Sequence, residues 1–188
     1  MNELIEAEGQ TLIGWRWVPT NKKNLSDIAR NSAPVVRQVF IKNNASERLA
    51  FERKLYVIRK QVEHWANAQG FEFYCPSMSS QTMVFKGLLA PEEVSDFYQD
   101  LQDPSFVSAF ALVHSRYSTN TFPSWKRAHP NRYIIHNGEI NTLRGNINWM
   151  KAREKQFVSQ VFGEDLAKIL PIVDETGSDS SMLDNAFE

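Results

Sequence analysis

The chain has 188 residues, of which 42% are hydrophobic and 23% are charged, and its formal net charge is −1. These values are typical of a globular domain and give no reason to expect nucleic acid or a membrane surface as a partner. No apolar run reaches the roughly 20 residues that span a bilayer, and the acidic N-terminus has no signal-peptide architecture. The single cysteine, Cys75, excludes an internal disulfide and argues against a thiolate metal cluster. Together these features favour a cytoplasmic protein.

The first part of the chain predicts two strands and a long amphipathic helix. Residues 1–10 resemble the end of a helix, and strands are expected over residues 12–18 and 35–41, on either side of a polar loop. A helix is expected over residues 46–68, with Gly70 at its C-terminal end. Its apolar face recurs at helical spacing and consists of Leu55, Ile58, Val62 and Trp65.

The remaining elements alternate short strands with helices. Strands are expected over residues 71–75, 83–85 and 106–113, the last of them central because it is mostly apolar. Three helices are expected, and the last of them begins near residues 177–180. The first helix opens at Pro91, and its inner face is expected to hold Val94, Phe97, Tyr98 and Leu101. The second helix is capped by Thr142 and runs towards Gly163, and its inner face is expected to hold Leu143, Ile147, Met150, Phe157 and Val161. This order favours an α+β fold with antiparallel sheets over a doubly wound parallel sheet.

An Asn-Gly pair follows the apolar residues at 133–135. Asn137-Gly138 is a dipeptide that readily adopts positive φ, and a turn there would present the Gly138 N–H beside the Asn137 amide. Two neutral donors that converge on one point suit the stabilisation of an oxyanion. A hairpin turn is the simpler explanation of the dipeptide, but the helical pattern that begins at Thr142 leaves no room for a second strand.

Other polar residues each admit a structural and a functional reading. Arg116 follows an apolar segment within a Ser/Thr/Asn-rich stretch, which suits a carboxylate clamp or a surface ion pair. Asp179 precedes a helix and could serve as its N-cap. The histidines lack metal-ligand spacing and are interpreted as structural, and Cys75 as a buried, inert thiol. The histidines concerned are His114, His129 and His136.

These residues belong to one longer pattern. It consists of residues 114–125, His129-Pro130, residues 136–142, Gly145-Asn146 and residues 148–150, with residues 51–56, 84–87 and 177–180 on either side. The pattern closely resembles the glutaminase domain of glutamate synthases, which is a class II glutamine amidotransferase. The resemblance covers nearly the whole chain, so that residues 1–188 are expected to form part of a single such domain.

The resemblance implies an N-terminal-nucleophile hydrolase fold, an αββα sandwich of two antiparallel sheets. In that family an N-terminal cysteine attacks the side-chain amide of glutamine and its own α-amine acts as base, because the pKa of an α-amine is about 7.7–8.0. By position, Asn137 and the N–H of Gly138 would form the oxyanion hole. Arg116 and Thr119 would hold the α-carboxylate of glutamine, and Asp179 would pair with its α-ammonium group.

The resemblance also implies a larger parent enzyme, which makes glutamate from 2-oxoglutarate with ammonia taken from L-glutamine. FMN and an iron–sulfur cluster are expected in that parent, and no cofactor is expected in this chain. The expected partners are L-glutamine, the remaining domains of glutamate synthase, and a small electron-transfer subunit or ferredoxin.

One departure from the family pattern affects the expected activity. Position 1 is Met and position 2 is Asn, where the family has its nucleophilic cysteine and a Gly-rich strand. The chain is therefore expected to begin inside the domain and to be inactive alone. A non-catalytic glutamine-binding or regulatory module derived from this domain is the alternative. A thiol hydrolase that uses Cys75 is a third reading, which the predicted mid-strand setting of this residue disfavours.

Overall fold

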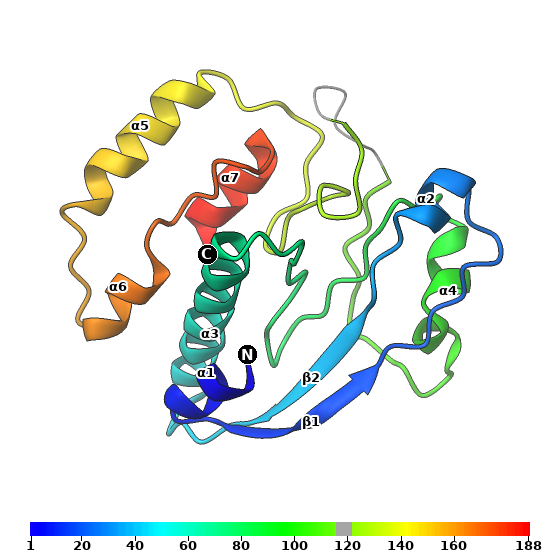
Figure 1. Ribbon diagram of the computed structural model, residues 1–188, viewed down its shortest axis with the longest axis horizontal. Coiled ribbons are helices and arrows are strands. Elements are labelled where there is room, and N and C mark those ends of the chain that lie inside the picture. Colours follow the sequence, from blue (N-terminus) through cyan, green and yellow to red (C-terminus); the bar gives the residue numbers. More distant parts are fainter. Residues whose placement is uncertain (116–121) are drawn as a thin grey trace.

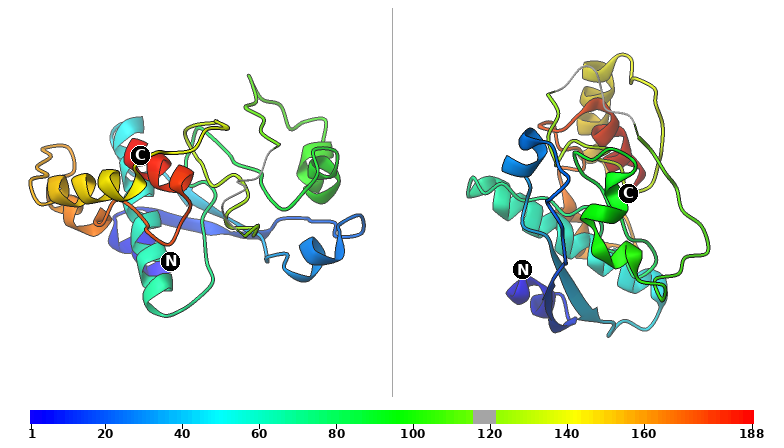
Figure 2. Two further views of the ribbon diagram at one scale, coloured as in Figure 1. Left: turned by 90° about the horizontal axis from the view of Figure 1, so that it is seen from above. Right: turned by 90° about the vertical axis from the view of Figure 1, so that its right-hand side faces the viewer.

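A computed structural model describes residues 1–115 and 122–188. The described residues combine helices with a two-stranded antiparallel sheet, which confirms the α+β class. Helix α3 runs through the middle of the molecule, with α5, α6 and α7 on one side and the sheet leading away towards α2 and α4 (Figures 1 and 2). The elements are α1 (Asn2–Ala7), β1 (Thr11–Trp17), α2 (Asp27–Asn31), β2 (Arg37–Lys42), α3 (Arg48–Ala68), α4 (Glu93–Phe97), η1 (Gln99–Gln102), α5 (Leu143–Glu154), η2 (Gly163–Asp165), α6 (Leu166–Ile169) and α7 (Asp179–Phe187).

The sheet pairs the two strands that the sequence predicts in its first part. Leu12 is opposite Ile41 and Gly14 is opposite Phe40, so that Ile13 forms a bulge in β1. Leu12 and Ile41 pack against a core cluster that joins α1 to α3, while Ile13 is exposed. Both predicted strands are therefore confirmed, with ends shifted by one or two residues.

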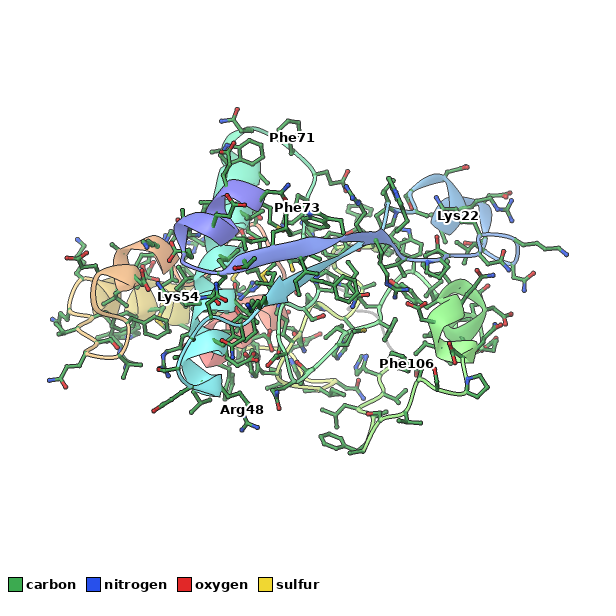
Figure 3. The ribbon with its side chains drawn as sticks, turned by 90° about the horizontal axis from the view of Figure 1, so that it is seen from below. Lys22, Arg48, Lys54, Phe71, Phe73 and Phe106 are labelled. Atoms are coloured by element: carbon green, nitrogen blue, oxygen red, sulfur yellow. The ribbon has the colours of Figure 1, made fainter. Side chains whose placement is uncertain are left out.

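Helix α3 is confirmed, and most of its predicted apolar face is buried. Leu55, Ile58 and Val62 lie in the interior, whereas Trp65 is 56% exposed, so its assignment to the core was wrong. The Trp65 ring packs instead on Phe71, with 5.6 Å between the ring centroids; Figure 3 labels Phe71 just beyond the end of α3. Gly70 adopts φ 71° just after the last turn, as a C-terminal glycine should.

Ion pairs centred on the buried carboxylate of Glu8 fix α3 to its neighbours. Lys54 of α3, which Figure 3 labels, contacts Glu8 at 2.9 Å and Asp165 at 2.5 Å. Lys168 contacts the other Glu8 oxygen at 2.7 Å. Burial by itself would raise the pKa of Glu8, but the hydrogen bonds from Lys168 and Lys54 outweigh it and lower that pKa. These contacts join the N-terminal helix to α6 across α3.

The strands predicted over residues 71–75, 83–85 and 106–113 are not formed, so these assignments were wrong. Within the described ranges the chain has one sheet of two strands, and these three segments run as irregular chain. A strand needs a neighbour for its backbone hydrogen bonds, and the sheet offers them none. The segment predicted to be central is instead exposed, with Val107 at 84%, Phe110 at 76% and Val113 at 79%.

The predicted helices of the second part of the chain form, but two are shorter than expected. Helix α4 ends at Phe97, and Phe97 and Tyr98 are buried against Trp125 as part of one core cluster. Helix α5 ends at Glu154, so Phe157 and Val161 lie beyond it. Thr142 is the N-cap residue of α5, as predicted, but it has φ 57° and its side chain makes no capping hydrogen bond. No helix in the described residues is long and apolar enough to cross a membrane.

Candidate functional site

Helix α7 holds the segment that carries the Asn-Gly pair. Asp184, which is fully buried, accepts hydrogen bonds from the backbone N–H groups of Arg132 at 2.8 Å and Tyr133 at 3.0 Å. Asp179, five residues earlier on α7, accepts one from the N–H of Ile140 at 2.9 Å. Carboxylate acceptors make stronger hydrogen bonds than neutral ones. One helix therefore fixes the segment on both sides of Asn137.

The Asn137 side chain is oriented by a histidine. Its Oδ1 lies 2.6 Å from Nε2 of His114. An amide oxygen can only accept, so His114 donates this hydrogen bond and its proton is on Nε2. The oxygen end of the amide is thereby occupied, and the NH₂ end is the one that can donate to another group. This is the orientation that an oxyanion donor requires.

The backbone N–H of Gly138 is also bonded to a histidine. It donates to Nδ1 of His136 at 3.1 Å, a contact between residues only two positions apart. An oxyanion that used this N–H would have to displace the ring. The φ of Gly138 lies outside the left-handed region, and positive φ occurs instead at Thr142. The expected positive-φ turn at Asn137-Gly138 was therefore wrong.

Two of the three histidines, His114 and His129, lie side by side, although their spacing in the sequence gives no sign of it. The rings of His114 and His129 lie 4.3 Å apart, and His129 adopts φ 44°. Burial, followed by the proximity of His114, lowers the pKa of His129 to about 4, so this ring is neutral at pH 7. Among the described residues no group of three His, Cys, Asp or Glu side chains could hold a metal ion.

Asp179 is the first residue of α7, and Ser178 is the N-cap. The Ser178 hydroxyl accepts from the Ser181 N–H at 3.3 Å, so the capping role considered for Asp179 belongs to its neighbour. The positive end of the helix dipole favours a carboxylate at this position. Asp179 Oδ2, which bonds Ile140, retains a second lone pair for another donor. The other two predicted substrate residues, Arg116 and Thr119, lie outside the described residues.

Cys75 has the properties of an inert thiol. It is buried, its Sγ donates to the Ser77 carbonyl at 3.2 Å, and its carbonyl oxygen accepts from Arg132. Burial, reinforced by the charge of Glu63, raises the pKa of the thiol to about 11, so almost no thiolate exists at pH 7. The predicted burial is confirmed, although the strand predicted around Cys75 is not formed. A thiol hydrolase that uses Cys75 is therefore disfavoured.

Two residues of this site escaped the sequence reasoning. Asp184 lies in the middle of a short helix, where an acidic residue is ordinarily solvated, and His114 is 23 residues from its partner Asn137. Neither residue belongs to a local sequence motif that would identify it. The available signal was a polar residue, Asp184, close to the apolar residues Met182 and Leu183, because a polar group that is buried with them must find partners.

The whole chain, residues 1–188, matches the family model of glutamine amidotransferases class-II. The chain belongs to the class-II glutamine amidotransferases. Within this family it is similar to the glutamate synthase [NADPH] large chain of Bacillus subtilis, with 66% identity over 190 residues, which cover 100% of this chain and 12% of the relative. A glutamate synthase [NADH] of Schizosaccharomyces pombe is 45% identical over 99% of this chain and 9% of its own length. A ferredoxin-dependent glutamate synthase of Pyropia yezoensis is 40% identical over 98% of this chain and 12% of its own length.

The amidotransferase chain thus spans about an eighth or less of the curated relatives that it matches. The match includes Asn137, Gly138 and Asp179, which the structure places on one segment and on the helix that holds it.

Proposed function

We propose that this chain is part of the glutamine-hydrolysing domain of a glutamate synthase, which supplies ammonia from L-glutamine for glutamate synthesis from 2-oxoglutarate. The observation that carries the proposal is the 66% identity to a glutamate synthase large chain over the whole chain. The orientation of Asn137 by His114 adds a local argument, because it leaves an amide donor available for an oxygen that gains negative charge.

In this proposal Asn137 and the Gly138 N–H stabilise the oxyanion. When a thiolate attacks the side-chain amide carbon of glutamine, the carbonyl oxygen becomes negative and needs donors that are already in place. The Gly138 N–H becomes available when its hydrogen bond to His136 is released. The nucleophile is not assigned to a residue of this chain, since Cys75 is buried and protonated.

Arg116, Thr119 and Asp179 are proposed to select free glutamine. A free amino acid carries an α-carboxylate and an α-ammonium group, which peptide-bound glutamine lacks. Arg116, helped by Thr119, would bind the carboxylate, and Asp179 would pair with the ammonium group. The place of Asp179 at the start of α7, with one oxygen holding Ile140 beside the Asn-Gly pair, supports its part in this arrangement.

The proposal extends to the fold and the larger protein. The domain would complete an αββα sandwich of two antiparallel sheets in the cytoplasmic full-length enzyme, in which FMN and an iron–sulfur cluster serve the synthase reaction. This chain does not fit an iron–sulfur cluster, because such clusters need several thiolates and the sequence has one cysteine, which is buried. The remaining domains, and an electron-transfer subunit or ferredoxin, are the proposed partners.

The test is a kinetic comparison of three variants in the full-length protein that contains this chain. Asn137→Ala should lower kcat by about 10²–10³-fold with little change in KM, because an oxyanion bond matters mainly in the transition state. Arg116→Lys and Asp179→Asn should instead raise KM for glutamine, because each weakens a contact to the bound amino acid. The measurements are steady-state ammonia release and the melting temperature of each variant.

Asp27→Asn is the matched control for Asp179→Asn. Asp27 is likewise the first residue of its helix, after a serine N-cap, but it is exposed and lies on α2. This variant should leave kcat and KM unchanged. Normal kinetics in all three site variants would refute the site assignment, and glutamine binding without ammonia release by the full-length protein would favour the non-catalytic module.

A further inference from the structure

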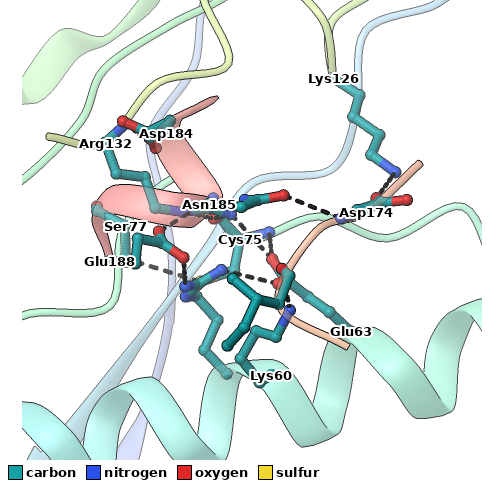
Figure 4. A network of polar contacts seen from close by, with 12 residues as sticks. Lys60, Glu63, Cys75, Ser77, Lys126, Arg132, Asp174, Asp184, Asn185 and Glu188 are labelled. Atoms are coloured by element: carbon teal, nitrogen blue, oxygen red, sulfur yellow. Dashed lines mark hydrogen bonds and ion pairs between the residues drawn. The ribbon is translucent and has the colours of Figure 1, made fainter. Parts of the chain in front are cut away.

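A pocket of about 240 Å³ lies between α3, the chain around residues 126–132 and the segment that leads into α7. None of Asn137, Gly138 and Asp179 lines it. Its lining is rich in cationic side chains: Lys60, Lys86, Lys126, Arg127 and Arg132. Figure 4 shows Lys60 and Glu63 on α3, with Arg132 near them and the Lys126–Asp174 pair beyond.

The carboxylates of the pocket are already paired. Glu63 binds Arg59 at 2.8 Å and Arg132 at 3.0 Å. Asp174 lies 3.4 Å from Lys126. Glu175 pairs at 2.5 Å with Lys151, which is not part of the lining. The acidic groups therefore neutralise other cations and leave the two buried lysines, Lys60 and Lys86, without a carboxylate of their own.

The two buried lysines contact neutral oxygen atoms. Lys60 is 5% exposed, and its Nζ donates to the carbonyl oxygens of Pro171 and Ile172, each at 2.9 Å. Lys86 is 8% exposed, and its Nζ donates to the Lys126 carbonyl at 2.6 Å and lies 4.9 Å from the centroid of the Tyr74 ring. Within residues 1–115 and 122–188 neither lysine forms an ion pair. Burying an ammonium group without a counter-charge disfavours the folded state.

We propose that this pocket binds a small oxyanion, a carboxylate or a phosphate, between Lys86 and the rim formed by Lys126 and Arg127. Such an anion would supply the counter-charge that Lys86 lacks and would accept from its unused N–H donors. Lys86, Lys126 and Arg127 all line this pocket, and the Lys86 ammonium group donates to the backbone carbonyl of Lys126 at 2.6 Å, so the three cationic side chains surround one space.

The pocket is separate from the proposed glutamine site but adjoins it. Gly177 and Ser178 belong to its lining, and Ser178 is the N-cap of α7 and precedes Asp179. An anion held there would contact the start of the helix that holds the Asn-Gly segment. Binding of the anion does not depend on glutamine hydrolysis, so this proposal can fail or succeed independently of the proposed function.

The test is isothermal titration of the full-length protein with inorganic phosphate and, separately, with succinate, in a cationic amine buffer containing little other anion. At least one of the two should bind with one-site saturation. Lys86→Met should weaken that binding at least tenfold, because methionine fills the buried space without a charge. Arg127→Gln, at an exposed rim position, should weaken it severalfold without affecting the fold. Lys23→Met, in an exposed loop, should bind as the unmodified protein does.

The two titrations distinguish the ligand classes: saturation with succinate alone indicates a dicarboxylate site, and saturation with phosphate alone indicates a phosphate site. Absence of saturation for both anions up to about ten millimolar would overturn the proposal. Equal affinities of the Arg127→Gln, Lys86→Met and Lys23→Met variants for the anion would also overturn the proposal, because the anion would then bind elsewhere. This conclusion does not depend on the melting temperature of the Lys86→Met variant.

Discussion

At the residue scale, Lys86 is a buried cation whose protonation opposes folding. Burial, followed by the charges of Arg132 and Lys126, lowers its pKa from the ordinary value of 10.5 to about 7. Between these two pH values the unfolded chain binds a proton that the folded chain does not. The destabilisation caused by Lys86 therefore has its full value below pH 7 and decreases as the pH rises from about 7 to about 10.

Lys86→Met should remove this dependence on pH. In a buffer of low anion content, the variant should be more stable than the unmodified protein at pH 6–7 by an amount on the order of a few kcal/mol, and the difference should shrink towards pH 10. Urea unfolding at several pH values measures it. Groups that titrate in this range and lie away from Lys86 are common to both proteins and cancel in the difference. Parallel pH curves for the two proteins would contradict the prediction.

Single residues also decide which donors the candidate site offers. His114 occupies the oxygen of the Asn137 amide at 2.6 Å, and His136 occupies the N–H of Gly138 at 3.1 Å. The NH₂ group of Asn137 is thus directed away from His114, whereas the N–H of Gly138 is already bonded to His136. The difference follows from hydrogen-bond chemistry, since an amide has two ends and a backbone N–H has one.

At the element scale, α7 determines where the Asn-Gly segment lies. The segment has no strand partner among the described residues, so its backbone N–H groups bond to side chains of α7 instead of to a sheet. Asp184 provides two of these bonds from a fully buried position. The helix itself begins at a serine cap, which is a local feature of the sequence.

Asp184→Ala should therefore destabilise the fold more than an ordinary helix substitution. Two partly buried N–H groups, those of Arg132 and Tyr133, lose their acceptor, and the expected loss of unfolding free energy is about 2–4 kcal/mol. Chemical denaturation provides the measurement. Asp27→Ala is the control, because Asp27 is exposed on α2 and its ion pair with Arg30 should contribute less than about 1 kcal/mol. Equal losses for both variants would show that α7 does not hold the segment.

At the scale of the whole molecule, one apolar segment lacks a cover. Phe106, Val107, Phe110, Leu112 and Val113 are between 43% and 84% exposed on one stretch of irregular chain. Contiguous apolar residues with unpaired backbone groups favour association with another chain or segment.

The chain of residues 1–188 should therefore self-associate as its concentration rises. Val107→Ser combined with Phe110→Ser should reduce the association, because it removes two of the most exposed apolar side chains of the segment. Light scattering after size-exclusion chromatography measures the mass. Ile28→Ser is the control, since Ile28 is 80% exposed but lies apart on α2. A monomer at all concentrations, or equal effects of both changes, would contradict this prediction.

Local patterns in the sequence determined the elements whose partners lie nearby. The two strands of the sheet, helix α3 with Gly70 after it, and the start of α7 all follow from periodicity and terminal residues. The pattern of residues around Arg116, Asn137 and Asp179 was also sufficient to indicate the amidotransferase family, which the match over residues 1–188 shows.

The tertiary structure decided what depends on distant partners. Among the described residues, residues 106–113 have strand composition but no neighbouring strand, and Trp65 has core spacing but is exposed. The bonds from His114 to Asn137 and from Asp184 to the segment before it join residues 23 and about 50 positions apart. Backbone propensity and side-chain period act over a few residues, whereas these contacts exist only once the chain has folded.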